Sequence, residues 1–465
     1  MIAVYSFLGF LFCFIAIGLL SIKKRKQNTD DYHIASREIS PWLVALSAAA
    51  SKYSGFMFIG MIGMTYIMGL ASMWIMIGAV GGNLLVYLFI LPKFKNFSEK
   101  HRFASYGKLI SEGTGKEYKM LKYVTGFITI AFLGAYAAAQ LTAGSKALHV
   151  IFDWNYNTGA IIGAIIVLLY CFAGGIRASI WTDAAQSLVM ILAMSVLLIA
   201  SLIEIGGIKE LWLQLKSIDE NLTLIFPPNL LFGALLFVLG WITMGFITLG
   251  QPHIMIRYMT LRSNAKIKRV GIYYFSWVSI FTFVTICVGL VARVLLPEVA
   301  AFDEELALPK LSQNLLPEVL VGLVLAGIFA SIMSTADSLI LSCSATVSKD
   351  ILPKIGKSYT LTKAVTLIIT VFVLGIALYG NKNVFSLVIL SFGVIGVAFT
   401  PIVILYLFKQ KPSDLLSVLM ILGGVSTVLY WRESGYNTSV FEGLPGLGAS
   451  FAIFFIGKML RAIRK

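Results

Sequence analysis

Residues 48–58 read Ala-Ala-Ala-Ser-Lys-Tyr-Ser-Gly-Phe-Met-Phe and place Lys52 between two apolar runs. A charged side chain at membrane depth costs a few kcal/mol on insertion scales. Such residues usually face the interior of a helix bundle and mark the path of a substrate or an ion. Ser54 and Gly55 follow at once, which favours an interrupted helix. The stretch therefore predicts a membrane protein with a buried transport site.

The composition agrees with this interpretation. The chain has 465 residues, of which 58% are hydrophobic and only 13% charged, far less charge than a soluble domain of this length carries. Apolar segments of about 18 residues or more recur from end to end, which is typical of a polytopic helical membrane protein. The net charge of +15 lies in loops. We therefore expect the lipid bilayer as a partner, and no nucleic acid.

Hydropathy predicts thirteen spans, one of which precedes the Lys52 stretch. The first span lacks a basic segment before it and has a basic run at 23–26 after it, which is the pattern of a retained anchor with its N-terminus outside. With that topology, 29 of the 37 Lys and Arg residues are cytoplasmic. We therefore predict a cell (inner) membrane protein with a cytoplasmic C-terminus. The spans are 2–22, 40–69, 72–92, 120–151, 156–174, 177–205, 228–256, 270–297, 315–346, 361–380, 384–408, 413–431 and 444–460.

A second span carries a comparable interruption. Span 228–256 contains Gly245, Gly250 and Pro252, and proline removes an amide donor and breaks the helical ladder. The two interrupted spans are five helices apart. Paired interruptions at matching places are the best sequence indication of an inverted-repeat transporter. Glycine and proline are also common in membrane helices, which is the alternative explanation.

Three hydroxyls share one face of span 315–346, because Ser331, Ser334 and Thr335 are spaced i, i+3 and i+4. Hard cations such as sodium prefer oxygen ligands. These hydroxyls, with carbonyls from a broken helix, would make a small neutral cage. Alternatively, they bond to the preceding turn or join helices.

Two further charged residues have open interpretations. Asp183 is either an ion-site or relay carboxylate, or an interfacial residue at a helix start. Lys146 is expected near an external helix end, where snorkelling of its side chain explains it.

Signatures of enzymes are missing from the sequence. Gly113-Thr114-Gly115-Lys116 has Ile110 and Glu117 at positions where a phosphate-binding loop needs glycine and Ser or Thr. We expect no enzymatic activity and no cofactor. An ion gradient, of Na+ or H+, is then the natural energy source.

Several stretches resemble the sodium/solute symporter family, in particular its bacterial proline-permease branch. The resemblance covers nearly the whole chain, including the helix count. Its motifs are Ser47 to Gly55, Gly174 to Gln186, Gly250 to His253, Ser331 to Ser338, and Gly396 to Pro401.

The resemblance implies an all-α LeuT-type fold in a single transmembrane domain. It would consist of an extra N-terminal helix (2–22), two inverted five-helix repeats (40–205 and 228–408) and two C-terminal helices (413–460). A sodium site would involve the backbones of Ala50, Tyr53 and Ser331 and the hydroxyls of Ser334 and Thr335. The substrate would lie between the broken helices, near Ser54, Gly55, Trp241, Met244, Thr248 and Pro252.

Lys52 departs from the family pattern, in which relatives carry a short polar residue or aspartate. An ammonium there opposes a sodium ion. We expect Lys52 to replace the ion, held by Ser334, Thr335 or Asp183, with proton-coupled or sodium-independent transport as the result. Alternatively, Lys52 snorkels to the cytoplasmic vestibule and sodium coupling is intact.

The leading hypothesis is a secondary transporter that moves a small organic solute, such as an amino acid or another zwitterion, by alternating access. No obligate protein partner is evident. The alternative of another class is a membrane sensor module that binds solute without moving it, and a channel is a third. Met244 and Thr248 replace aromatic residues of proline permeases, so the identity of the solute stays open.

Overall fold

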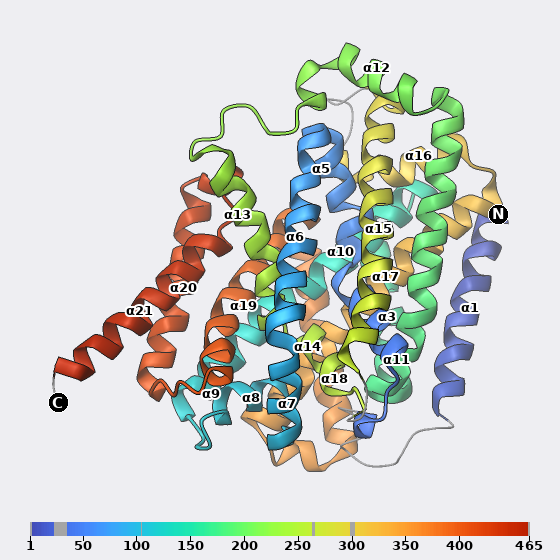
Figure 1. The fold of residues 1–465 in the computed structure, drawn as a ribbon. Helices are drawn as coiled ribbons and strands as arrows, with labels where there is room; N and C mark the ends of the chain where they lie inside the picture. Colours follow the sequence, from blue (N-terminus) through green and yellow to red (C-terminus); the bar gives the residue numbers. More distant parts are fainter. Residues whose placement is uncertain (1, 23–34, 104, 263–265, 298–302, 464–465) are drawn as a thin grey trace.

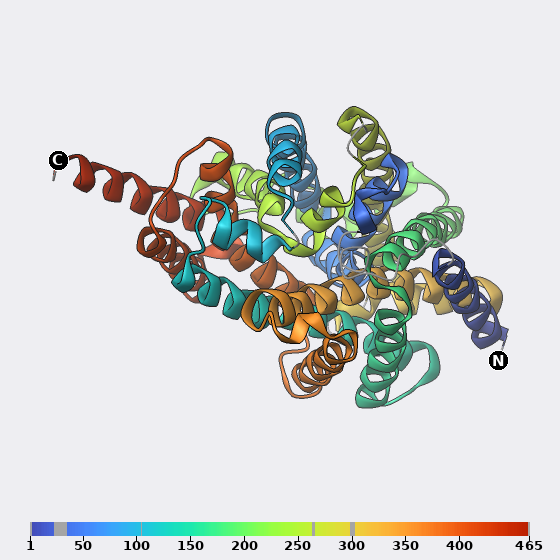
Figure 2. The ribbon, with the colours of Figure 1, turned by 90° about the horizontal axis from the view of Figure 1, so that it is seen from below.

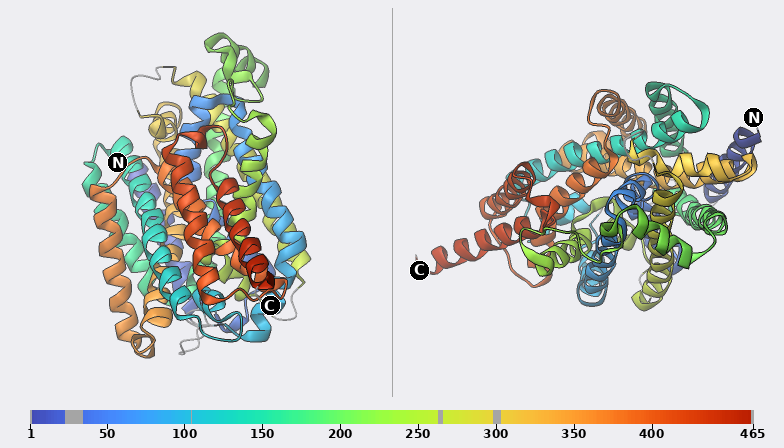
Figure 3. Two further views of the ribbon diagram at one scale, coloured as in Figure 1. Left: turned by 90° about the vertical axis from the view of Figure 1, so that its left-hand side faces the viewer. Right: turned by 90° about the horizontal axis from the view of Figure 1, so that it is seen from above.

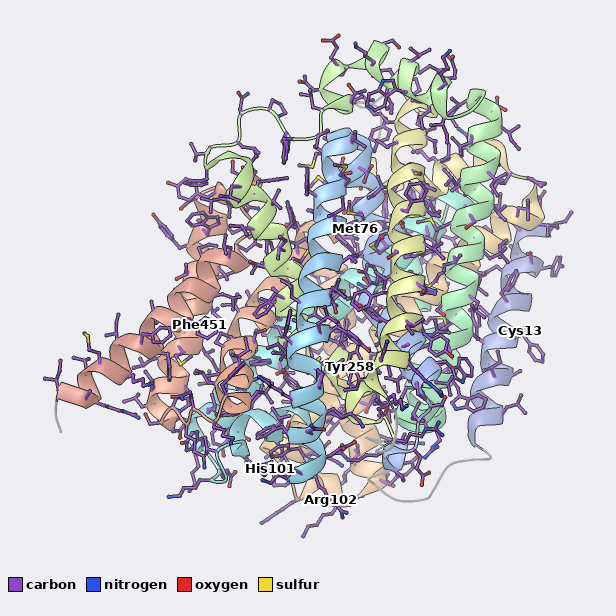
Figure 4. All side chains as sticks on the ribbon, in the orientation of Figure 1. Cys13, Met76, His101, Arg102, Tyr258 and Phe451 are labelled. Carbon is purple, nitrogen blue, oxygen red and sulfur yellow. The ribbon has the colours of Figure 1, made fainter. Side chains whose placement is uncertain are left out.

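The computed structural model describes residues 2–22, 35–103, 105–262, 266–297 and 303–463, without the side chains of residues 19, 21, 22 and 170–175. The predicted basic run at 23–26 lies outside the described residues. Long helices run roughly parallel through one bundle, and the two ends of the chain lie at opposite edges of it (Figures 1 and 2). Side chains fill the space between the helices, as around Met76 and Tyr258 in Figure 4.

The first predicted interruption lies where the sequence placed it. Helix α3 (Pro41–Lys52) ends at Lys52, and the short helix α4 (Gly55–Phe58) starts after two non-helical residues. Helix α5 (Gly60–Met68) then continues to the upper end of the bundle (Figure 1). The end of α3 leaves its last carbonyls without partners inside the helix, so other groups must satisfy them.

The second predicted interruption is also present. Helix α13 (Gly233–Phe246) passes into a 3₁₀ turn at Ile247–Gly250, and Gln251 has an extended backbone. Helix α14 (Pro252–Met259) then starts at the proline, whose missing amide suits the first turn of a helix. An isolated parallel bridge between Ile39 and Leu261 joins the segment before α3 to the segment after α14. The lower halves of the two broken helices are thus tied together.

The remaining predicted spans correspond to long helices, some of them with a π-helical turn at Val86–Ile90, Thr129–Leu133 or Thr346–Ile351. The segments predicted as 156–174 and 177–205 fall within a single helical element. The helices are α1 (Ile2–Ile22), α6 (Met73–Leu85), α7 (Leu91–His101), α9 (Lys119–Ile128), α10 (Gly134–Phe152), α11 (Tyr156–Ile205), α15 (Ile267–Leu295), α17 (Glu318–Ala345), α18 (Tyr359–Tyr379), α19 (Val384–Leu407), α20 (Asp414–Glu433) and α21 (Gly443–Ile463).

Within the described ranges, ten helical segments are long and apolar enough to cross a membrane. The predicted all-helical membrane architecture is therefore confirmed, whereas the count of thirteen spans stays a prediction. Three helices that hydropathy did not predict lie in the connections, namely α8 (Tyr106–Glu112), α12 (Ile208–Ile218) and α16 (Ala307–Leu315). Helix α12 caps the upper end of the bundle, and α8 lies at the lower end (Figure 1).

Helices α6 and α13 pack closely because glycine lines their contact. A Cβ atom on Gly82 would lie 1.8 Å from the Ile242 carbonyl oxygen, and one on Gly245 would lie 2.2 Å from the Ala79 carbonyl oxygen. Real side chains never approach backbone so closely, so only glycine fits at either position. Small residues of this kind let the backbones of membrane helices touch. The two helices stay adjacent when viewed from the side and from above (Figure 3).

Candidate functional site

The hydroxyls of α17 meet the freed carbonyls of α3. Ser334 Oγ donates to the Ala50 carbonyl at 3.2 Å, and Thr335 Oγ1 lies 3.4 Å from that oxygen and 3.3 Å from the Ser51 carbonyl oxygen. These carbonyls belong to the last turn of α3, where no amide of the same helix reaches them. The arrangement concentrates oxygen ligands and the negative end of a helix dipole at one point.

The other predicted ion-site residues lie beside this contact. The Ser331 carbonyl accepts from Ser334 Oγ at 3.1 Å, while the Ser331 hydroxyl bonds to the Ile328 carbonyl of its own helix. Tyr53 is the first residue beyond α3, and its amide donates to the Ala49 carbonyl at 2.9 Å. The structure thus brings Ala50, Ser334 and Thr335 into contact, with Ser331 and Tyr53 beside them. We call this set of five residues the ion pocket.

Lys52 is the last residue of α3, and its environment differs from both expectations. Its side chain is only 7% exposed, so it does not snorkel to an aqueous surface in this conformation. Among the described residues, its Nζ atom has no hydrogen-bond partner, so the expected bonds to Ser334, Thr335 or Asp183 are not formed. The ammonium lies 5.6 Å from the centre of the Tyr53 ring, within range of a cation–π interaction.

Asp183 instead pairs with a residue that the sequence analysis did not single out. Its Oδ2 atom lies 3.3 Å from Arg257 Nη2 and accepts from Ser47 Oγ at 2.6 Å. The Arg257 guanidinium also donates to Ser179 at 3.2 Å, to Ser47 at 3.2 Å and to Ser338. Asp183 and Arg257 are fully buried, and Asp183 lies inside α11 and not at the start of a helix, as one alternative expected. Its role in an ion site or relay stays a prediction. The pair joins α3, α11, α14 and α17.

Of the predicted substrate residues, Ser54, Gly55, Thr248 and Pro252 lie at the two breaks, whereas Trp241 and Met244 lie in α13 before the second one. Ser54 caps α4 and accepts from the Tyr136 hydroxyl at 3.3 Å, and the Gly55 amide donates to Gln140 Oε1 at 2.9 Å. On the second broken helix, Trp241 stacks on Phe441 with ring centres 5.5 Å apart, and Thr248 Oγ1 accepts from Asn83 at 3.4 Å. The buried Met244 lies between them in sequence, and Pro252 begins α14.

Helix α10 connects the two breaks through residues that the sequence analysis missed. The Tyr136 ring, which bonds to Ser54, also meets the His253 ring edge-on at 5.7 Å. Both ring nitrogens of His253 and the amide nitrogen of Gln140 are buried and have no hydrogen-bond partner among the described residues. Such groups need a partner, because an unpaired buried polar atom costs free energy. In the sequence, the only signal for Tyr136, Gln140 and His253 is that each is a polar side chain in an otherwise apolar segment.

A cavity extends from the second break towards the lower end of the bundle. We call it the vestibule. It reaches Pro252 and Arg257 at its inner end and Ser105 and Asp350 near α8, with hydroxyl side chains along its wall.

The opposite end is held by a cluster that we call the outer latch. Lys146 Nζ lies 2.6 Å from both Asp303 Oδ2 and Glu305 Oε2, and Lys146 is only 3% exposed. The expected snorkelling of Lys146 is therefore wrong, because these carboxylates compensate its buried charge. Glu305 also accepts from the amides of Val384 and Phe385 at 3.0 and 2.7 Å. The latch thus binds α10 and the start of α19 to the connection between α15 and α16.

Burial raises the pKa of the Glu305 carboxyl above its ordinary value, although the Lys146 ammonium and the two amides act in the opposite direction. As the pH falls, the Glu305 carboxylate therefore takes up a proton at a higher pH than an exposed glutamate does.

Replacing Glu305 with alanine is expected to release the start of α19. The amides of Val384 and Phe385 would lose charge-assisted hydrogen bonds, so their hydrogen exchange should accelerate by about tenfold or more. Exchange measured by mass spectrometry on the purified full chain tests this. The neighbouring Glu304→Gln is the matched control. Unchanged exchange at residues 384–385 in Glu305→Ala would contradict the latch.

Two broken helices around a buried pocket of oxygen ligands, in a bundle of membrane-length helices, define a secondary transporter of the LeuT fold. Comparisons with known proteins agree. The chain belongs to the sodium:solute symporter family, whose profile matches residues 32–414.

The chain is similar along its length to characterised relatives. It is 26% identical over 450 residues to the high-affinity proline transporter PutP of Bacillus subtilis, covering 94% of both chains. It is 29% identical over 482 residues to a sodium/proline symporter of Staphylococcus aureus, covering 98% of this chain and 91% of the relative. These relatives are transporters, which confirms that no enzyme is to be expected here.

Solved structures confirm the fold. A Na+-coupled sialic acid symporter in a substrate-bound outward-open state superposes with a TM-score of 0.81 at 20% identity, covering 99% of this chain and 98% of that one. Mhp1, a nucleobase-cation-symport-1 family transporter, has a TM-score of 0.57 at 13% identity, with 91% and 92% covered.

Proposed function

We propose that this chain carries a small zwitterionic solute, such as an amino acid, across the cell membrane of a bacterium by alternating access. The N-terminus would be outside and the C-terminus cytoplasmic, as the distribution of Lys and Arg predicts. In that orientation the vestibule opens to the cytoplasm and the outer latch closes the external side. The relatives that transport proline support an amino acid as the solute.

The solute would bind between the two breaks. Ser54, Gly55, Trp241, Met244, Thr248 and Pro252 would form its surroundings. The unpartnered nitrogens of His253 and Gln140, and the indole nitrogen of Trp241, would supply polar contacts. A polar solute that satisfies these groups would gain the hydrogen bonds that the empty protein lacks.

The main support for a transport mechanism without sodium is the balance of buried positive and negative charges. Apart from Arg177, whose charge is paired with Glu38, four charged side chains of the described residues lie buried on α3, α11, α14 and α17, namely Lys52 (7% exposed), Arg257 (1%), Asp183 (0%) and Asp337 (3%). Two are cations and two are anions, so the set is neutral without a bound metal ion. Lys52 also puts its charge at the negative end of the α3 dipole, where a cation is favoured.

Lys52 would therefore take the electrostatic place of sodium, without the hydrogen bonds that the sequence analysis expected. A buried lysine can exchange a proton, so transport would be coupled to protons or independent of sodium. Sodium-coupled symport is the second candidate. The contacts of Ser334 and Thr335 with the carbonyls of α3 favour it, as does the family to which the chain belongs.

Uptake by the purified protein in liposomes, with sodium and proton gradients imposed separately, tests the proposal. Labelled proline and sialic acid, which relatives and structural neighbours transport, are the first solutes, followed by other zwitterions found by thermal shift. We expect uptake that follows the proton gradient, or only the solute gradient, and does not change with sodium. Uptake that follows sodium and ignores pH would overturn the role of Lys52 and leave the transport function intact. Solute binding without uptake would indicate a sensor instead.

A further inference from the structure

Asp350 is a buried carboxylate that the proposed transport mechanism does not use. It lies in the π-helical turn Thr346–Ile351 that follows α17, at the α8 end of the vestibule. It is only 5% exposed. Its Oδ1 atom accepts from Ser105 Oγ at 2.6 Å, which ties the turn to the start of α8.

The second carboxylate oxygen of Asp350, Oδ2, has no comparable hydrogen bond. Oδ2 is buried and has no hydrogen-bond partner among the described residues. The charges of Lys108, Lys349 and Lys122 act on Asp350, but none of these lysines is hydrogen-bonded to Oδ2. Lys122 also lines the vestibule, and its Nζ atom is paired with Glu117 at 2.8 Å. A carboxylate oxygen left unpaired in a buried place costs more free energy than a neutral group does, because charged groups have a larger desolvation penalty.

The surroundings of Oδ2 are suited to a small cation. The vestibule wall around Asp350 carries hydroxyls of Ser105 and Thr346, and hydroxyl oxygens join carboxylates in binding hard cations and ammonium groups. A Cβ atom on Gly107 would lie only 2.2 Å from Oδ2, so only glycine fits against this side of the carboxylate. The Arg257 guanidinium lines the inner end of the same cavity. The vestibule thus has the paired Arg257 at its inner end, and Asp350 together with Lys122 at its end near α8.

We propose that Asp350 forms a second cation site, on the path between the breaks and the α8 side of the bundle. Its ligand is a small monovalent cation, either an alkali ion or the ammonium group of the zwitterionic solute. The site does not depend on which ion drives transport, because it shares no residue with the ion pocket.

Binding of radioactive sodium and of labelled methylammonium to the full chain in nanodiscs tests the site. We expect Asp350→Asn to weaken the binding of at least one probe by about tenfold or more, because the variant keeps an acceptor for Ser105 and removes only the charge. Glu112→Gln on the neighbouring helix α8 is the matched control and should bind as the parent does. The probe that responds identifies the source of the cation.

Two further variants keep the result interpretable. Gly107→Ala introduces a methyl group against Oδ2 and should weaken the same probe, even if Asp350→Asn folds poorly. Ser334→Ala combined with Thr335→Val disrupts the ion pocket and should leave that probe bound. Binding of both probes that is unchanged in Asp350→Asn and Gly107→Ala, or absent from the parent protein, would overturn the proposal. Sodium binding lost only in the Ser334 and Thr335 variant, with methylammonium binding unchanged in Asp350→Asn and Gly107→Ala, would also overturn it, and would separately argue against Lys52 as the built-in cation.

Discussion

Replacing Lys52 with alanine is expected to create tight sodium binding in a protein that otherwise binds sodium weakly or not at all. Two unit charges about 4 Å apart repel by about 4 kcal/mol at an effective dielectric constant of 20, which corresponds to about a thousandfold in affinity. Without Lys52, the buried set of Arg257, Asp183 and Asp337 has one uncompensated negative charge. The hydroxyls of Ser334 and Thr335 and the carbonyl of Ala50 already face one another and would receive the ion.

Sodium titrations followed by isothermal calorimetry or thermal shift would measure this gain. Lys95→Ala is the matched control, since Lys95 is a buried lysine on α7 whose partner is Glu99. Adding Ser334→Ala and Thr335→Val to Lys52→Ala should abolish the new binding. If the parent protein and Lys52→Ala bind sodium equally, the ammonium of Lys52 does not act on the ion pocket.

Replacing Arg257 with glutamine is expected to be the most destabilising single change in the bundle. Removing one partner of a buried ion pair costs about 3–5 kcal/mol, because the other charge stays buried without compensation. Here Asp183 would lose its ion-pair partner, Asp337 would lose the favourable charge of the Arg257 guanidinium, and the links from α14 to α3, α11 and α17 would be lost. Thermal denaturation of the purified full chain should show a large fall in the midpoint.

A second substitution separates charge from packing. Asp183→Asn in the Arg257→Gln background should recover much of the lost stability, because it removes the uncompensated carboxylate. Arg177→Gln is the matched control, since Arg177 is buried on the same helix as Asp183 but its carboxylate partner, Glu38, is half exposed. Loss of the Arg177–Glu38 ion pair should lower the free energy of unfolding by about 1 kcal/mol or less. Similar losses from Arg177→Gln and Arg257→Gln would contradict a special role for the buried cluster.

The sequence predicted what depends on local backbone chemistry. Pro252 and the small residues around Ser54 determine where a helix stops, so both interruptions lie where they were predicted. The i, i+3, i+4 spacing of Ser331, Ser334 and Thr335 likewise determines which helix face they share. That face meets the end of α3 in the structure.

Features that depend on distant parts of the chain could not be predicted. The sequence analysis did not single out Arg257, because nothing local shows that Asp183, 74 residues away, is its partner. Lys146 looked like a snorkelling lysine for the same reason, as its partners Asp303 and Glu305 lie in a separate connection. Helices α8, α12 and α16 are too short and too polar for hydropathy to reveal them.

The glycine contact between α6 and α13 limits how the carrier can move. Because no side chain separates Gly82 from α13 or Gly245 from α6, sliding of either rod past the other would force backbone atoms to collide. We therefore expect the two helices to move as one rigid unit during transport, with the change of angle at the extended residue Gln251 below them. In the transport cycle, the angle between this helix pair and the ion pocket would change, while the packing of α6 against α13 would stay the same.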